Sequence, residues 1–180
     1  MMILPGEIYR RLQTGDVLPP GLTVDGDLYL TDCAALTALP PGLTVGGDLR
    51  LTGCTRLTAL PSGLTVGGDL WLDGCPALTA LPPGLTVRGD LRLIGCPGLT
   101  ALPPGLTVAG WLVLSDCPAL TALPSDLTVG GRLDIRDCEP LPAEESGELG
   151  EPQSLTALNA VASTFGLTGS EYERILQAET

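Results

Sequence analysis

The six cysteines of this 180-residue chain recur at a constant spacing of 21 residues. Thiols can form disulfides, bind metals or act as nucleophiles. The chain has no His to activate a thiol and no Cys-x-x-Cys pair for zinc. A spacing that repeats once per structural unit favours a column of buried structural thiols, with disulfides and metal ligation as the alternatives. The column would contain Cys33, Cys54, Cys75, Cys96, Cys117 and Cys138.

Four aspartates follow the same period and open the predicted strand of successive units: Asp27, Asp48, Asp69 and Asp90. Like charges stacked one strand apart repel each other unless a counter-ion or solvent screens them. Arg50 and Arg92 lie close by on the same predicted face, so we expect a surface network of Asp and Arg. Calcium binding is the alternative, because Gly-Gly-Asp is similar to a calcium-binding nonapeptide repeat, although the period here is 21.

Large and charged side chains occupy the middle outward position of the predicted strands. This row contains Tyr29, Arg50, Trp71, Arg92, Val113 and Asp134. Trp71 should lie between Arg50 and Arg92, within reach of cation–π stacking. Trp111 adds a second large aromatic one row over, and Tyr, Trp and Arg dominate interface hot spots. The predicted partner-binding residues are Tyr29, Arg50, Trp71, Arg92, Trp111, Asp69, Asp73 and Asp134; surface packing of the two tryptophans is the alternative.

A 21-residue repeat must position these side chains, and its copies begin at residues 18, 39, 60, 81, 102 and 123. Each copy opens with Leu-Pro, which favours an extended or turn-like segment over a helix. Asp48–Thr52 alternates Leu with polar residues, which predicts a strand with Leu inward. The Gly at position 47 and its equivalents indicates a turn or a close backbone approach. Seven positions per copy should be buried, in the second copy Leu39, Leu43, Val45, Leu49, Leu51, Cys54 and Leu57.

The pattern Leu-x-Leu-x-x-Cys-x-x-Leu resembles the leucine-rich-repeat consensus, with Cys where Asn is common. The Leu-Pro opening and the short period resemble the bacterial class of these repeats. The resemblance covers residues 18 to about 141, and a Gly-Gly pair departs from it where Leu is usual. It implies one right-handed leucine-rich-repeat solenoid with a parallel β-sheet on the concave face, an extended, polyproline-like convex side and short helical caps.

The segments on either side of the repeats (18–141) differ from them in composition. Residues 1–17 predict an N-terminal helical cap, with a helix over Pro5–Gln13. Residues 142–153 read as an acidic Pro/Gly linker, and 154–180 as a C-terminal helical segment with one apolar face. Because that face needs a partner, we expect this segment to cap the solenoid; separate binding is the alternative.

Charge and hydropathy narrow the classes of function. The net charge is −12 and every basic residue is Arg, which argues against a nucleic-acid partner. No apolar run is long enough for a membrane span, and the first residues do not resemble a secretory signal. We therefore expect a cytoplasmic protein without cofactors or a membrane partner. Export by a route that leaves no compositional signal is the alternative.

Together these features predict non-enzymatic recognition of a protein or peptide through the outward strand face. Short bacterial leucine-rich repeats resemble the recognition domains of translocated effectors, so binding of a host protein is one alternative. Some such effectors carry a C-terminal ubiquitin-ligase domain, but no Cys follows Cys138 here and that activity is not carried over. Self-association through a sheet edge or the C-terminal segment is the other alternative.

Overall fold

The computed structural model describes residues 5–14 and 18–138. These lie in the first of two units, Met1–Gly147 and Glu148–Thr180. The predicted linker and C-terminal helical segment fall outside the described residues. We call the successive repeats coils 1 to 6, and they comprise residues 18–38, 39–59, 60–80, 81–101, 102–122 and 123–138.

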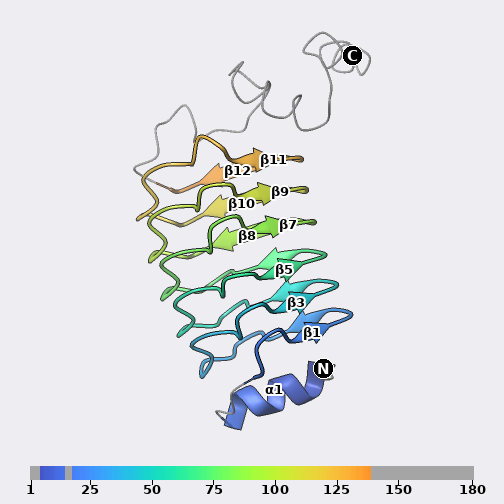
Figure 1. The fold of residues 1–180 in the computed structure, drawn as a ribbon. Helices are drawn as coiled ribbons and strands as arrows, with labels where there is room; N and C mark the ends of the chain where they lie inside the picture. The colour runs from blue at the N-terminus through green and yellow to red at the C-terminus, as the bar shows by residue number, and fades with distance from the viewer. Residues whose placement is uncertain (1–4, 15–17, 139–180) are drawn as a thin grey trace. The chain divides into compact units, whose positions relative to one another are not determined.

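Residues 18–138 form a parallel β-solenoid in which each coil contributes one strand to each of two sheets (Figure 1). The strands of the first sheet are β1 (Thr23–Val24), β3 (Thr44–Val45), β5 (Thr65–Val66), β7 (Thr86–Val87), β9 (Thr107–Val108) and β11 (Thr128–Val129). Those of the second are β2 (Leu28–Tyr29), β4 (Leu49–Arg50), β6 (Leu70–Trp71), β8 (Leu91–Ile94), β10 (Leu112–Ser115) and β12 (Leu133–Arg136). The chain is therefore a repeat protein in which equivalent strands of successive coils pair in parallel.

The second sheet corresponds to the strand predicted over Asp48–Thr52. Its register pairs each residue with the one 21 positions later, as in Leu49↔Leu70 and Arg50↔Trp71. In coils 1 to 3 its strands span two residues, but the hydrogen bonds between coils extend further: Leu51 N donates to Trp71 O at 2.8 Å, and Gly53 N to Asp73 O at 2.8 Å. Neighbouring coils thus stay paired along the whole outward face.

The first sheet was not predicted from the sequence, which indicated only extended or turn-like chain between Leu-Pro and the strand. It forms because the β-branched pair Thr-Val recurs at the same position of every coil, so stacking brings identical pairs into register. Val points inward and is fully buried in β3, β5, β7 and β9, whereas Thr faces outward. The turn before it uses glycines with positive φ, such as Gly42 at 70°.

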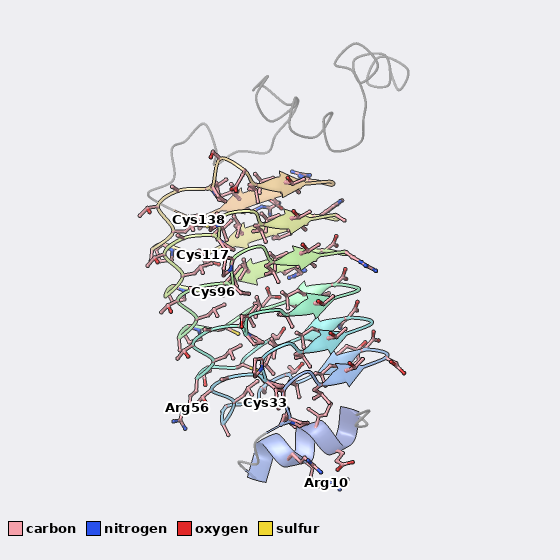
Figure 2. All side chains as sticks on the ribbon, viewed as in Figure 1. Arg10, Cys33, Arg56, Cys96, Cys117 and Cys138 are labelled. Atoms are coloured by element: carbon pink, nitrogen blue, oxygen red, sulfur yellow. The ribbon has the colours of Figure 1, made fainter. Side chains whose placement is uncertain are left out.

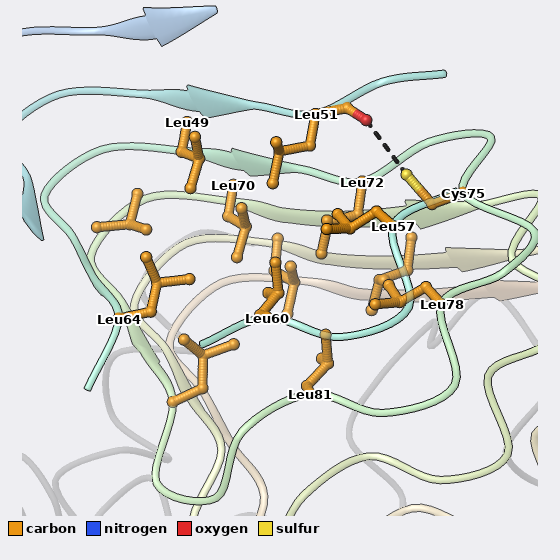
Figure 3. Close-up of a cluster of buried hydrophobic side chains, with 14 of the residues drawn as sticks. Leu49, Leu51, Leu57, Leu60, Leu64, Leu70, Leu72, Cys75, Leu78 and Leu81 are labelled. Carbon is orange, nitrogen blue, oxygen red and sulfur yellow. Dashed lines mark hydrogen bonds between the residues drawn. The ribbon is translucent and has the colours of Figure 1, made fainter. Parts of the chain in front are cut away.

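The core is a set of aliphatic ladders that run through the stack (Figure 3). All seven positions predicted to be inward in coil 2 are buried, and six of them, among them Leu49 and Leu51, are completely so. No polar or charged residue is buried among the described residues. One coil alone could not bury these faces, so each coil depends on its neighbours.

One helix, α1 (Pro5–Thr14), precedes the coils and matches the predicted N-terminal helix. Glu7 near its start pairs with Arg11 one turn later at 3.0 Å. Ile8 is fully buried and belongs to the same hydrophobic cluster as the ladders. The described residues contain no helix with the length and apolar character needed to cross a membrane.

Candidate binding surface

The outward side chains of the second sheet form three parallel rows. The first row is Asp27, Asp48, Asp69, Asp90, Trp111 and Arg132; the middle row is Tyr29, Arg50, Trp71, Arg92, Val113 and Asp134; the third row is Thr31, Thr52, Asp73, Ile94, Ser115 and Arg136. The strand register aligns the middle row from end to end. We call these three rows together the strand face.

The first four members of the middle row form one continuous stack. The guanidinium carbon of Arg50 lies 5.0 Å from the ring centroid of Tyr29 and 4.0 Å from that of Trp71. The guanidinium carbon of Arg92 lies 4.8 Å from Trp71. Arg50 Nε and Trp71 Nε1 are hidden inside the stack and make no hydrogen bond with the described residues. This packing orders the side chains before any partner binds.

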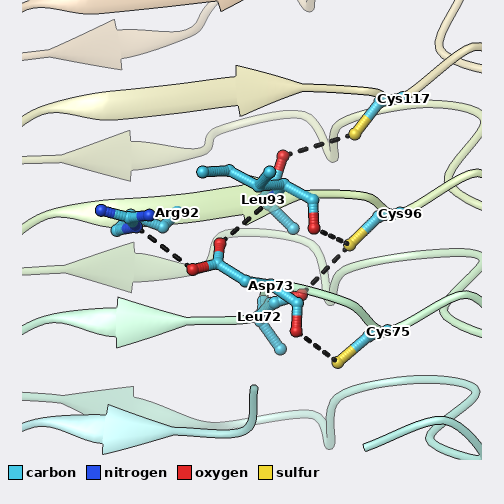
Figure 4. A network of polar contacts seen from close by, with 8 residues as sticks. Leu72, Asp73, Cys75, Arg92, Leu93, Cys96 and Cys117 are labelled. Atoms are coloured by element: carbon cyan, nitrogen blue, oxygen red, sulfur yellow. Dashed lines mark hydrogen bonds and ion pairs between the residues drawn. The ribbon is translucent and has the colours of Figure 1, made fainter. Parts of the chain in front are cut away.

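Carboxylates hold the two arginines in place. Arg50 Nη2 lies 3.5 Å from Asp48 Oδ2, and Arg92 Nε lies 3.3 Å from Asp73 Oδ2 (Figure 4). At the start of the stack the Tyr29 hydroxyl donates to Asp27 Oδ2 at 2.7 Å. These contacts confine both guanidinium groups between rings and carboxylates, so their charges are largely compensated within the protein.

The four aspartates of the first row share a second role, because each accepts a backbone N–H from the next coil. Asp27 Oδ1 accepts from Asp48 N at 2.9 Å, and the bond recurs from Asp48 to Asp69 N and from Asp69 to Asp90 N. The last acceptor is Asp90, which takes the N–H of Trp111 at 2.7 Å. We call this series the carboxylate ladder. The bond from Asp48 is the main cause that lowers the pKa of Asp27, and the bond to Asp27 raises the pKa of Tyr29.

The carboxylate ladder also explains the Gly that precedes each of these positions. A Cβ at Gly47, Gly68, Gly89 or Gly110 would run into the Oδ1 atom of the aspartate in the preceding coil, and it would also crowd the backbone of that coil. Gly26, which has no coil before it, has nothing within 4 Å of the same point. The close-approach explanation for this Gly therefore holds in coils 2 to 5, where the carboxylate and backbone of the preceding coil fill the space that a side chain would need.

The six cysteines follow one another from coil to coil, and Figure 2 labels Cys33, Cys96, Cys117 and Cys138. All six are buried and free of disulfides. The thiol of Cys75 donates to the backbone O of Leu51 in the preceding coil at 3.2 Å (Figure 3), and Figure 4 shows the equivalent bonds of Cys96 and Cys117. The same bond joins Cys54 to Leu30 O, Cys96 to Leu72 O and Cys117 to Leu93 O, at 3.1 to 3.4 Å. Each of these four thiols thus adds a hydrogen bond between its own coil and the backbone of the preceding one.

Burial makes most of these thiols weak acids. It raises the pKa of Cys54 and of Cys75 to about 11, and it is also the main cause of the raised pKa values of Cys33 and Cys138. Cys96 and Cys117 are coupled: contact with Cys117 lowers the pKa of Cys96, and contact with Cys96 raises that of Cys117. Most of the column is therefore uncharged at neutral pH.

The junction between coils 5 and 6 differs from the four before it. Junctions between earlier coils carry one carboxylate bond and one thiol bond each. At the last junction Trp111 takes the place of the aspartate, and the Cys138 thiol donates to Arg136 O of its own coil at 3.3 Å. Within the described part of the chain, the last coil therefore lacks both links.

The structure brings together five of the predicted partner-binding residues, Tyr29, Arg50, Trp71, Arg92 and Asp73, through the stack and its ion pairs. Asp69 and Trp111 lie in the first row, and Trp111 is 53% exposed. Asp134 is in the middle row but pairs with Arg136 at 2.9 Å, two coils away from Arg92. The backbone role of Asp27, Asp48 and Asp90 was missed, although their shared spacing with the preceding Gly was a usable signal. No group of three side chains suited to hold a metal occurs among residues 5–14 and 18–138.

The fold and face together define a parallel β-solenoid with a layered aromatic and charged surface. No protein-family model matches the chain, and no curated protein or solved structure is significantly similar to it.

Proposed function

We propose that this protein binds another protein or a peptide through the strand face and has no catalytic activity of its own. The observation that carries the proposal is the ordered stack of Tyr29, Arg50, Trp71 and Arg92, with the exposed Trp111 one row away. Aromatic residues and Arg contribute most to interface energies, and side chains ordered in advance lose less entropy on binding.

The distribution of sequence variation supports a site built on a scaffold. Inward positions of the second sheet keep Leu in nearly every coil, whereas the middle row changes from Tyr to Arg, Trp, Val and Asp. The outward positions of the first sheet instead keep Thr in all six coils. Diversity is thus concentrated on the strand face, where it affects recognition without disturbing the core.

We assign the solenoid to the leucine-rich-repeat type. The Leu-x-Leu-x-x-Cys-x-x-Leu spacing supports this, because the thiols of coils 2 to 5 bond to the backbone of the preceding coil at the position where such repeats often have Asn. The Gly-Gly pair departs from the consensus of these repeats. Because the repeats resemble the short bacterial class found in translocated effectors, binding of a host protein is one form of the proposed function.

A pull-down with mass spectrometry tests the proposal. Trp71→Ala combined with Trp111→Ala should abolish capture of partners that the unmodified chain retains. The matched control is Thr65→Ala combined with Thr86→Ala, two exposed positions on the first sheet, and it should leave capture unchanged. Capture that persists in the double Trp variant, while its melting temperature is unchanged, would show that the strand face is not the binding surface.

Self-association is the competing form of interaction. Light scattering over a range of concentrations distinguishes it, because a second copy would raise the apparent mass with concentration. If the double Trp variant stays associated, the contact lies outside the strand face.

A further inference from the structure

The charges of the strand face that the protein itself does not compensate are negative. Each aspartate of the carboxylate ladder uses Oδ1 for the next coil, which leaves Oδ2 for other partners. Asp27 Oδ2 accepts from Tyr29, and Asp48 Oδ2 pairs with Arg50. Among the described residues, the Oδ2 atoms of Asp69 and Asp90 have no hydrogen-bond or ion-pair partner.

The two arginines of the stack offer little positive charge to an acidic partner. Arg50 is held between two rings and next to Asp48, and Arg92 lies over Trp71 and next to Asp73. An acidic partner would have to compete with these carboxylates and would also face Asp69 and Asp90. Charge complementarity therefore favours a basic partner over an acidic one.

Trp111 completes the surface that such a partner would meet. It follows Asp69 and Asp90 in the first row, and its backbone N–H is fixed by Asp90 Oδ1 at 2.7 Å. Neighbouring strands lie about 4.8 Å apart, so the carboxylate of Asp90 is one strand from the Trp111 side chain. With 53% of its surface exposed, Trp111 offers an apolar plane beside two uncompensated carboxylates.

We propose that Asp69, Asp90 and Trp111 receive a Lys or Arg side chain from a basic segment of the partner. The aliphatic stem of that side chain would lie against Trp111, and its charged head would pair with the free Oδ2 atoms. This inference rests on the proposed function and names the chemistry of its partner. The net charge of −12 adds long-range attraction, so binding should weaken as salt rises.

The test measures binding of a fluorescently labelled lysine octapeptide to the full chain by anisotropy, with a glutamate octapeptide as the acidic probe. Asp69→Asn combined with Asp90→Asn removes both charges, while the amide oxygen still accepts the N–H of the next coil. This variant and Trp111→Ala should each weaken binding of the basic peptide by about tenfold. The glutamate peptide should not bind.

The matched control removes the same amount of charge elsewhere. Asp25→Asn combined with Asp32→Asn changes two exposed aspartates of coil 1, and Asn tolerates the positive φ of 55° at Asp32. This variant should change the affinity by less than about twofold. An equal loss in both variants, binding of the acidic peptide, or binding of neither peptide would overturn the inference.

The two proposals fail in different ways. If partners from the pull-down depend on Trp71 and Trp111 but not on Asp69 and Asp90, recognition by the strand face stands and the basic-segment inference falls. If no substitution on the strand face affects those partners, the proposed function falls as well.

Discussion

Each cysteine of coils 2 to 5 shows how an almost apolar side chain can still donate a hydrogen bond to a buried backbone carbonyl. A thiol is small enough to pack among Leu side chains, yet it can donate to a carbonyl such as Leu51 O. The column was predicted from its spacing alone, whereas the acceptor was not, because it lies in the preceding coil, 24 residues earlier. Spacing shows which residues stack, but only the course of the turn shows which backbone atoms they reach.

The raised pKa values of Cys54 and Cys75 predict a loss of stability at alkaline pH. Between the ordinary value of 9.0 and about 11, the unfolded chain releases thiol protons that the folded chain keeps. The free energy of unfolding should therefore fall as pH rises through this window, with no contribution from these thiols below it. Urea titrations from pH 7 to 11 measure the effect.

The double variant Cys54→Ala, Cys75→Ala is the control for this prediction. It should lower stability at neutral pH, because two hydrogen bonds are lost, and it should also reduce the alkaline decline. An unchanged decline would assign the effect to other groups.

The Gly that precedes each first-row position should be sensitive to substitution wherever a preceding coil packs against it. Gly68→Ala places a methyl group against the Asp48 carboxylate and should cost about 1–3 kcal/mol in urea unfolding. Gly26→Ala is the equivalent change in coil 1, where the space is open, and should stay within about 0.5 kcal/mol of the unmodified chain. Equal costs would mean that backbone conformation, and not the carboxylate, selects glycine.

At the scale of elements, a strand of the second sheet is joined to the next through side chains as well as backbone. The sequence predicted the six strands of this sheet and their inward Leu residues, because alternation and a fixed period determine both. It missed the Thr-Val sheet, since two residues are too few to show alternation. It also attributed the aspartates to pairing with Arg50 and Arg92, because the residue type of an aspartate does not show which group its carboxylate accepts from, and only the Gly before it pointed to a close neighbour.

The carboxylate ladder predicts different effects for two substitutions of the same residue. Asp48→Asn keeps an oxygen that can accept Asp69 N–H, so its stability should lie close to that of the unmodified chain. Asp48→Ala leaves that N–H without a protein acceptor and should cost about 1 kcal/mol more than the Asn variant. Chemical denaturation of the two variants measures the difference, and equal losses would mean that the negative charge matters more than the acceptor.

At the scale of the whole array, stability depends on the junctions between coils, and these junctions are unequal. Trp111→Asp should extend the carboxylate ladder into coil 6, because the Trp111 side chain occupies the space above Gly131 that a carboxylate fills in coils 2 to 5. Native-state hydrogen exchange should then slow in residues 128–136 and stay unchanged in coils 2 and 3. Faster or equal exchange in coil 6 would show that the missing link does not limit its stability.

Trp111 provides an exposed aromatic side chain, and it also takes the place of the aspartate that links each earlier coil to the next. Coil 6 stays paired with coil 5 through β10 and β12 but lacks that additional bond. Coil 6 should therefore open more often than coils 2 to 4, and the opening should begin at the junction that Trp111 borders. Binding of a partner to Trp111 would then change the hydrogen-exchange rates of coil 6, whose residues the partner does not need to touch. In this array the exposed aromatic side chain therefore lies at the junction where we expect unfolding to start.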